Sequence, residues 1–211
     1  MTAPGLHPAQ SNDGSARMLL ALKRVSDLVL VALALPIVAP AFLVIALLVR
    51  LSGPGPVLLR LSCVGQNGRV FGKYRFRIVY MDAERRLRAA ERDPQGDSGR
   101  DPRVTPIGAW LARNGLNRLP QLLNVLRGDM SVVGPRPITL ACQRDSYPFQ
   151  EHLLQVRPGI FTPESLVDEQ FARSETDRRA LDLAYAANPA LSTDTRILVT
   201  AFARMIGLRS V

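Results

Sequence analysis

The sequence predicts an α/β fold that is mostly helical with a small sheet, and a proline-broken, re-entrant membrane helix near its N-terminus. Three observations support this. An unbroken apolar run follows the first basic residues, several later stretches carry apolar side chains at helical spacing, and one glycine-punctuated stretch is typical of a hairpin. The 211 residues suit one domain with a membrane element, and 47% hydrophobic against 21% charged residues excludes a disordered chain.

The apolar run covers Leu28–Val49, 22 residues without a charged or polar side chain. A helix of this length measures roughly 33 Å, close to the thickness of a hydrocarbon core. A cleaved signal peptide is the alternative, with Lys23 and Arg24 as its basic start. Its best cleavage site, residues 32–34, lies in the middle of the run, which is the wrong place. The run is therefore expected to be a retained anchor.

Two prolines, Pro36 and Pro40, lie inside this run and predict a kink near its middle. A spanning helix normally has one strongly basic flank. Here both flanks are basic, which favours a helix that re-enters with both ends in the cytoplasm. A kinked helix that crosses the bilayer remains the alternative. The flanking residues are Arg17, Lys23 and Arg24 before the run, and Arg50, Arg60 and Arg69 after it.

We divide the chain into a polar tail expected to be disordered (1–16), a membrane-anchoring re-entrant helix (17–52) and a cytoplasmic domain (53–211). Turn residues at 52–56 end the membrane element. The final helix of the domain has two interpretations: it lies on the bilayer surface, or it packs into the core. The elements expected in the domain are a hairpin (57–77), a charged helix (81–92), an exposed loop (93–103), a helical stretch broken near Gly115 and Pro120 (105–127), rigid turns (132–137 and 157–159) and two helices (176–187 and 193–208).

The chain carries 27 Lys and Arg against 18 Asp and Glu, a net charge of +9, and all but two of the basic residues are arginine. Arginine binds phosphate and carboxylate through a planar fork, which suggests nucleic acid, anionic lipid or a phosphorylated small molecule as partner. An aromatic content of 6% and the apolar run argue against nucleic acid. The two cysteines and two histidines are too few for a disulfide framework, a zinc site or a histidine-rich metal centre.

Several motifs after residue 20 point to a known family. They are Lys23-Arg24 with Asp27, the turn 52–57, Gly65 and Gly68 with Phe71, residues 74–77 with 82–84, 101–108, the long block 119–131, Gly134–Pro137, Arg157–Ile160, and Tyr185 with 188–189 and Asp194. With these motifs the chain resembles the bacterial sugar transferase family, the monotopic phosphoglycosyl transferases.

The resemblance implies a re-entrant helix at the cytoplasmic face of the bacterial inner membrane. It also implies transfer of a phosphosugar from a UDP-sugar to undecaprenyl phosphate with release of UMP, a step in polysaccharide or glycoconjugate assembly such as exopolysaccharide biosynthesis. The family uses Mg²⁺ and an Asp-Glu dyad, in which the Asp attacks phosphorus and a covalent phosphosugar intermediate forms. A carboxylate nucleophile divides one phosphoryl transfer into two steps.

The dyad positions of this chain hold Asn117 and Arg118. An amide is a poor nucleophile and a weak metal ligand, and arginine stays protonated and repels a cation. We therefore expect a catalytically inactive or impaired protein, a pseudoenzyme that binds UDP-sugar or polyprenyl phosphate, or that pairs with itself or an active paralogue. No metal is expected at the altered dyad, and Mg²⁺ only if the protein is active.

The family motifs also nominate substrate- and phosphate-binding residues: Arg77, Arg136, Pro137, Arg157 and Gly159. A structural role is the alternative for each arginine, least so for Arg136. Two other functions stay open. One is an active transferase with a relocated carboxylate nucleophile, and the other is a basic peripheral nucleic-acid-binding protein. The carboxylates considered for relocation are Asp82, Glu84, Asp101 and Asp129, with Asp129 kept in its family context.

Overall fold

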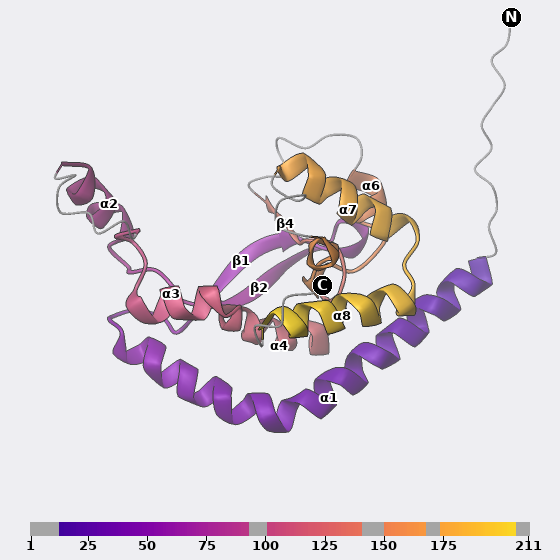
Figure 1. The fold of residues 1–211 in the computed structure, drawn as a ribbon, viewed down its shortest axis with the longest axis horizontal. Coiled ribbons are helices and arrows are strands. Elements are labelled where there is room, and N and C mark those ends of the chain that lie inside the picture. Colours follow the sequence, from indigo (N-terminus) through magenta and orange to yellow (C-terminus); the bar gives the residue numbers. More distant parts are fainter. Residues whose placement is uncertain (1–12, 93–100, 141–149, 168–173, 206–211) are drawn as a thin grey trace, which may run out of the picture.

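The computed structural model describes residues 13–92, 101–140, 150–167 and 174–205. A long helix, α1 (Asp13–Leu51), runs along one side of a body built from short strands and helices (Figure 1). The predicted class, mostly helical with a small sheet, is confirmed. Most of the predicted tail and of the loop 93–103 lies outside the described residues.

Helix α1 is continuous over 39 residues, including Pro36 and Pro40. It bends near its middle instead of breaking (Figure 1), as expected where proline removes a backbone donor. The helix begins at Asp13, before the boundary at residue 17 that the sequence suggested. Its stretch Met18–Leu51 is long and apolar enough to cross a membrane, and only 11% of its most apolar window is buried in the protein. A core helix would be mostly buried, so α1 is not a core helix.

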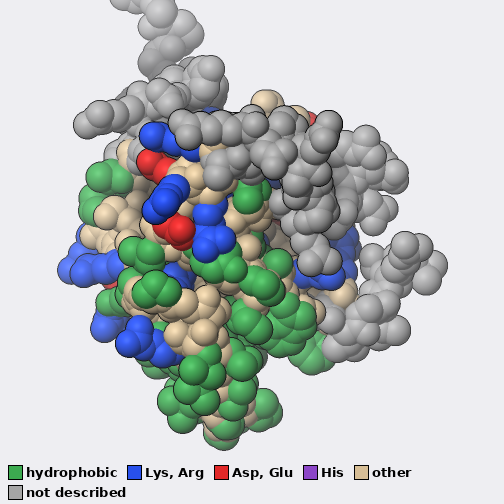
Figure 2. All heavy atoms as spheres, turned by 90° about the vertical axis from the view of Figure 1, so that its left-hand side faces the viewer, with side chains coloured by type: hydrophobic (Ala, Val, Ile, Leu, Met, Phe, Trp, Pro, Cys, Tyr) green, Lys and Arg blue, Asp and Glu red, His purple; other side chains and the backbone are tan. Residues whose placement is uncertain are grey.

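The exposed side chains of α1 are large and apolar. Leu33 is 70% exposed, Ile37 76% and Leu43 69%. In Figure 2, hydrophobic side chains gather over the lower end of the molecule, the side on which α1 lies in Figure 1. A continuous apolar surface of this kind marks a contact with lipid or another protein.

The predicted hairpin is confirmed. Strands β1 (Leu58–Val64) and β2 (Val70–Phe76) pair antiparallel around the short helix η1 (Gln66–Gly68). The turn needs left-handed backbone at Asn67 (φ 56°) and Gly68 (φ 73°), which these residue types tolerate. Strand β4 (Ile138–Thr139) extends the sheet in the order β2-β1-β4.

The two predicted rigid turns lie side by side. Strands β3 (Ser131–Val133) and β5 (Gly159–Phe161) form a parallel pair, and the turn after β3 approaches the turn before β5. A Cβ placed on Gly159 would lie 2.1 Å from the backbone nitrogen of Gly134, so neither glycine tolerates a side chain here. This close approach fixes the backbone next to Arg136 and Arg157.

The predicted helical stretches are also confirmed, with boundaries shifted by a few residues. The break near Gly115 and Pro120 is a short 3-10 helix between two α-helices. The helices of the body are α2 (Ala83–Arg92), α3 (Pro106–Arg113), η3 (Leu116–Gln121), α4 (Leu122–Arg127), α6 (Gln150–Leu153), η4 (Pro163–Leu166), α7 (Glu175–Ala187) and α8 (Leu191–Met205).

Helix α8, the final helix, packs into the core on one side and exposes apolar side chains on the other. Ile197 is fully buried and Ala201 nearly so, and they join the core. Val199 and Phe202 are 63% and 64% exposed on the other side. Phe202 therefore points away from the core, while Leu198 is partly buried against it.

Two apolar clusters form the core, and α1 contributes to both. Val31 enters the cluster around the hairpin, β3, β5, α7 and α8. Ile45 and Val49 enter a second cluster with Phe76 of β2 and Leu111 of α3. The apolar stretch between these contacts is largely exposed. Both halves of α1 are therefore packed on the same body.

Polar contacts fix the N-terminal half of α1. The Lys23 Nζ lies 2.5 Å from Asp194 Oδ2 in a buried ion pair, and the Tyr185 hydroxyl donates to Asp194 Oδ1 at 2.5 Å. Asp27 Oδ1 accepts from the Val132 backbone at 3.0 Å. The Lys23-Arg24 motif with Asp27 thus connects the helix to β3 and α8.

Arg77 fixes the other end. Its side chain is only 2% exposed, and its guanidinium donates to the carbonyls of Val49 (2.9 Å), Gly53 (2.7 Å) and Pro54. These carbonyls belong to the last turn of α1 and the loop after it, which lack helical partners. For Arg77 the structure favours the structural role over phosphate binding, because both terminal nitrogens of its guanidinium donate to these carbonyls.

Replacing Arg77 by Ala should lower the free energy of unfolding on the order of 3 kcal/mol, because three carbonyls lose a charged donor. Chemical denaturation in non-ionic detergent would measure it. Arg69→Ala, at an exposed position of the hairpin turn, is the matched control and should change stability by less than about 0.5 kcal/mol. Equal stability of the two variants would contradict the capping role.

Candidate active site

The altered dyad lies on η3, directly after Gly115. Gly115 has φ 68°, a left-handed conformation that favours glycine, and it turns the chain from α3 into η3. Asn117 is only 3% exposed, and its Oδ1 has no hydrogen-bond partner among the described residues. An unpaired buried amide oxygen costs roughly 1–3 kcal/mol. The position is therefore polar, closed to solvent and unsatisfied.

Arg118 enters a group of basic side chains, which we call the basic cluster: Lys73, Arg75, Arg118 and Arg136. Although part of Arg118 is exposed to solvent, desolvation lowers the pKa of its guanidinium, and the positive charges of Arg75 and Arg136 lower it further. Burial lowers the pKa of Lys73, and the positive charges of Arg75 and Arg118 lower it further. These effects place Arg118 within electrostatic reach of each of the other three cations.

The hairpin supplies two members of the basic cluster. Lys73 and Arg75 alternate with Tyr74 along β2 and therefore project from the same face of the strand. Their cross-strand partners on that face are Leu61 and Leu59. Strand β2 packs against η3, which brings this face next to the dyad positions.

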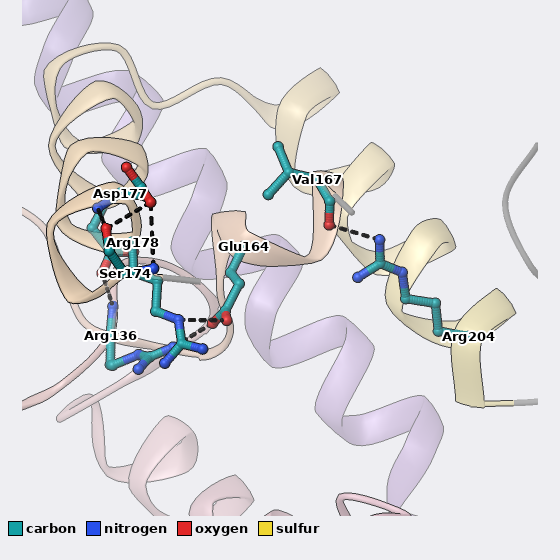
Figure 3. A network of polar contacts seen from close by, with 8 residues as sticks. Arg136, Glu164, Val167, Ser174, Asp177, Arg178 and Arg204 are labelled. Carbon is teal, nitrogen blue, oxygen red and sulfur yellow. Dashed lines mark hydrogen bonds and ion pairs between the residues drawn. The ribbon is translucent and has the colours of Figure 1, made fainter. Parts of the chain in front are cut away.

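Arg136 is positioned by acidic groups from two other elements. Its guanidinium forms an ion pair with Glu164 of η4, and Arg178 of α7 lies 3.0 Å from the same carboxylate (Figure 3). The Arg136 backbone donates to Asp182 of α7 at 3.2 Å. Pro137 follows in the same turn and restricts its backbone. These contacts hold Arg136 in a position where its positive charge acts on the guanidinium of Arg118.

Asp182 is a buried acid at the edge of this site. Burial raises its pKa to about 6, and the charges of Glu164 and Glu175 add to the shift, while the Arg136 backbone and its charge oppose it. Between about pH 4 and pH 6, Asp182 is therefore mostly protonated in the folded protein and mostly ionised in the unfolded chain.

The other predicted site residues lie elsewhere. Arg157 and Gly159 lie at the start of β5, and Arg157 lines a cavity beside α1 together with Lys23 and Arg24. Asp129 follows the turn that ends α4, and its carboxylate is 3.4 Å from the Asn124 amide. Arg77 caps α1, as described above. Of the five predicted substrate-binding residues, only Arg136 with its neighbour Pro137 joins the altered dyad.

The alternative carboxylates face solvent. Asp82 and Glu84 form i,i+4 pairs with Arg86 and Arg88, and α2 projects from the body (Figure 1). Asp101 pairs with Arg103 at 2.7 Å, and the Arg103 hydrogen bonds lower its pKa to about 2. None of these three acids is buried or turned toward another acid, as a relocated nucleophile and its partner would be.

The residues of this site do not fit a Mg²⁺ ion. Magnesium prefers carboxylate oxygens, whereas Asn117 offers a neutral oxygen and Arg118, Arg75 and Arg136 add positive charge. Within the described part of the chain, no three His, Cys, Asp or Glu side chains lie together as ligands. The arrangement suits an anion, because several guanidinium groups match the oxygens of a phosphate.

Sequence reasoning missed Lys73, Arg75, Glu164 and Asp182 as parts of the site. The alternation of Lys73 and Arg75 in a predicted strand was an available signal, because it puts two cations on one face. Glu164 and Asp182 gave no such signal, since their roles depend on how η4 and α7 pack around the turn of Arg136.

A family model described as bacterial sugar transferase matches residues 18–207. The chain belongs to the bacterial sugar transferase family. One relative is the exopolysaccharide production protein PSS of Rhizobium leguminosarum bv. phaseoli. It is 36% identical over 192 residues, which cover 85% of this chain and 92% of the relative.

Two other bacterial sugar transferases carry names that state an activity. The UDP-glucose:undecaprenyl-phosphate glucose-1-phosphate transferase of Escherichia coli (strain K12) is 38% identical over 66% of this chain and 29% of its own length. The putative undecaprenyl-phosphate N-acetylgalactosaminyl 1-phosphate transferase of Bacillus subtilis (strain 168) is 40% identical over 63% of this chain and 70% of its own. The chain thus spans less than a third of the E. coli protein.

The titration of Asp182 gives a measurable pH dependence. A folded-state pKa of about 6, against 3.8 for the model acid, predicts stability that falls as the pH rises from 4 to 6 and stays lower above 6. The contribution is up to about 3 kcal/mol. Thermal unfolding in detergent at pH 4.5 and 7.5 should show that Asp182→Asn loses this fall. Glu84→Gln, at an exposed acid, should keep it, and an identical pH response of Asp182→Asn and the unmodified protein would refute the assignment.

Proposed function

We propose that this protein is a membrane-associated bacterial sugar transferase of the polysaccharide assembly machinery that binds UDP-sugar or polyprenyl phosphate without turning it over. The observation that carries the proposal is the site itself. Asn117 and Arg118 stand where the family resemblance implies an Asp-Glu dyad, and Arg118 belongs to the basic cluster. Names of relatives support the substrate class, because they include undecaprenyl-phosphate transferases and an exopolysaccharide production protein.

The loss of turnover follows from chemistry. Attack on phosphorus requires a lone pair on a good nucleophile, and an amide oxygen is a weak one. Arg118 remains protonated and accepts no proton from a leaving or attacking group. Asn117 is also closed to solvent, so no water reaches its carbonyl in the described arrangement.

Binding without metal is the second part of the proposal. A nucleotide diphosphate needs positive charge around its oxygens, which Mg²⁺ supplies in many sites. Here the guanidinium groups of Arg75, Arg118 and Arg136 supply that charge. We therefore expect the affinity for a UDP-sugar to be unaffected by a chelator.

We infer that α1 enters the membrane from the cytoplasmic side and returns to it. Lys23 and Asp27 fix one end of the helix, and Val49 fixes the other, to the same body. The exposed apolar side chains lie between these points. A helix that crossed the bilayer would place its ends on opposite faces, about 30 Å apart. Contacts of both ends with one body, the bend in α1 and basic flanks on both sides support the re-entrant placement and a location at the inner membrane. Pairing with a second copy or an active paralogue stays a prediction.

The decisive experiment measures UMP release by the full chain in nanodiscs with Mg²⁺, undecaprenyl phosphate and a panel of UDP-sugars. We expect no release from the unmodified protein. We expect release from Asn117→Asp/Arg118→Glu, because the change restores the dyad and removes one cation. The matched control is Arg113→Glu. It makes the same arginine-to-glutamate change as at Arg118, but at an exposed position of α3. Release by the unmodified protein would overturn the proposal and direct attention to Asp129.

Titration of a UDP-sugar into the same preparations tests binding separately. The unmodified protein should bind equally with magnesium and with EDTA, and Arg118→Gln should weaken binding about tenfold, because one charged hydrogen-bond donor is lost. An affinity that requires magnesium would contradict the metal-free site. Absence of any binding by the unmodified protein would contradict the proposed ligand.

A further inference from the structure

A cavity of about 300 Å³ lies between the N-terminal half of α1 and the β3–β5 pair, apart from the altered dyad. Lys23, Arg24 and Asp27 line it from α1, Ser131 from β3 and Arg157 from the turn before β5. This volume is at the lower end of the range for small-molecule sites. The cavity is large enough for a small polar group and too small for a nucleotide sugar.

Two cations of the cavity are not neutralised. Lys23 is paired with Asp194, but Arg24 donates to the backbone carbonyls of Val125 (2.6 Å) and Leu126 (3.1 Å), which carry no net charge. No carboxylate lies within ion-pair distance of Arg157 among the described residues. Burial lowers the pKa of Arg24 and the positive charge of Arg157 lowers it further, while the negative charge of Asp27 opposes the shift. Two guanidinium groups that repel each other across a cavity are stabilised by an anion between them.

Two buried polar atoms in the same lining lack partners. Asp27 is 3% exposed and Ser131 1%, and neither Asp27 Oδ2 nor Ser131 Oγ has a hydrogen-bond partner among the described residues. A serine hydroxyl donates and accepts, whereas a carboxylate oxygen only accepts. A ligand that satisfies both atoms therefore carries acceptor oxygens and a hydrogen-bond donor. Buried polar groups are rarely left unpaired in folded proteins, which makes two such atoms in one cavity informative.

The position of the cavity along α1 indicates that such a ligand comes from the membrane. Its α1 residues end at Asp27, and the apolar run starts at Leu28. If α1 enters the bilayer as proposed above, this boundary lies at the level of the lipid headgroups. A phospholipid headgroup presents phosphate oxygens there, and a glycerol headgroup adds hydroxyl donors.

We propose that this cavity is a phospholipid headgroup site, with the phosphate diester between Arg24 and Arg157 and a headgroup hydroxyl donating to Asp27. Ser131 donates to the phosphate. The site does not depend on the sugar or on the fate of the dyad. The bound lipid joins α1 to β3 and to the turn before β5, because the side chains proposed to contact it come from all three.

Native mass spectrometry of the delipidated full chain tests the site. The probes are dioleoyl-phosphatidylglycerol and, as a comparison, dioleoyl-phosphatidylcholine, whose quaternary ammonium has no N–H or O–H to donate. One phosphatidylglycerol should stay bound at detergent concentrations that remove phosphatidylcholine. Arg157→Gln should lower the apparent affinity about tenfold, because one charged donor is lost and no side-chain contact among the described residues depends on it. Arg88→Gln, at an exposed arginine of the projecting α2, is the control and should bind like the unmodified protein.

A second variant tests the hydroxyl contact. Asp27→Asn keeps an oxygen for the Val132 backbone but replaces the unpaired oxygen by an amide nitrogen. It should reduce the preference for phosphatidylglycerol over phosphatidylcholine while Arg157→Gln weakens both. Equal retention of lipid by Arg157→Gln and Arg88→Gln would overturn the proposal. So would equal retention of the two lipids by the unmodified protein, or displacement of phosphatidylglycerol by inorganic phosphate at similar concentration, which would make the cavity a site for free phosphate.

Discussion

The attachment of both ends of α1 to one body is the constraint on which the rest of the structure depends. At one end a buried ion pair between Lys23 and Asp194 joins the helix to α8. At the other end Arg77 binds the carbonyls of the last helical turn. A buried charge is tolerable only with its partner in place, so neither end is free to move away. The apolar surface between the ends stays exposed on the described structure, which is the arrangement that the proposed insertion from one side of the bilayer requires.

The same attachment organises the site region. Asp27 accepts from the backbone of β3, and β3 leads into the turn that carries Arg136. The close approach of Gly134 and Gly159 leaves this turn no room to relax. Helix α1 and the turn that carries Arg136 are therefore joined through β3. If α1 inserts as proposed, this connection holds Arg136 at a defined distance from the bilayer surface.

Much of the fold was predictable because it depends on local rules. The long apolar helix, its bend, the hairpin around Gly68 and the break after Gly115 each follow from residues close together in the chain. The continuity of α1 through Pro36 and Pro40 did not follow, since a helix either bends or breaks according to how its ends are held. Here contacts of Lys23 and Val49 with distant segments decide the outcome.

The candidate site was predictable only in part, and for a physical reason. The motifs placed Asn117, Arg118 and Arg136 in one site, and the structure brings Arg118 and Arg136 within electrostatic reach. The family pattern also nominated Arg77 and Arg157, yet one caps a helix and the other lines a separate cavity. An arginine is equally suited to carbonyls, carboxylates and phosphates. Its partner is set by the three-dimensional packing, which a motif does not specify.

Asn117 shows that this site is not optimised for stability alone. Its amide oxygen is buried and unpaired, and an apolar side chain of the same shape would remove that cost. Arg118 likewise adds a cation to three others, where a neutral residue would relieve repulsion. The repulsion falls when an anion binds, because the cations gain a counter-charge. Arg118, one of the two residues at the altered dyad, is therefore also a residue that a bound sugar phosphate would stabilise.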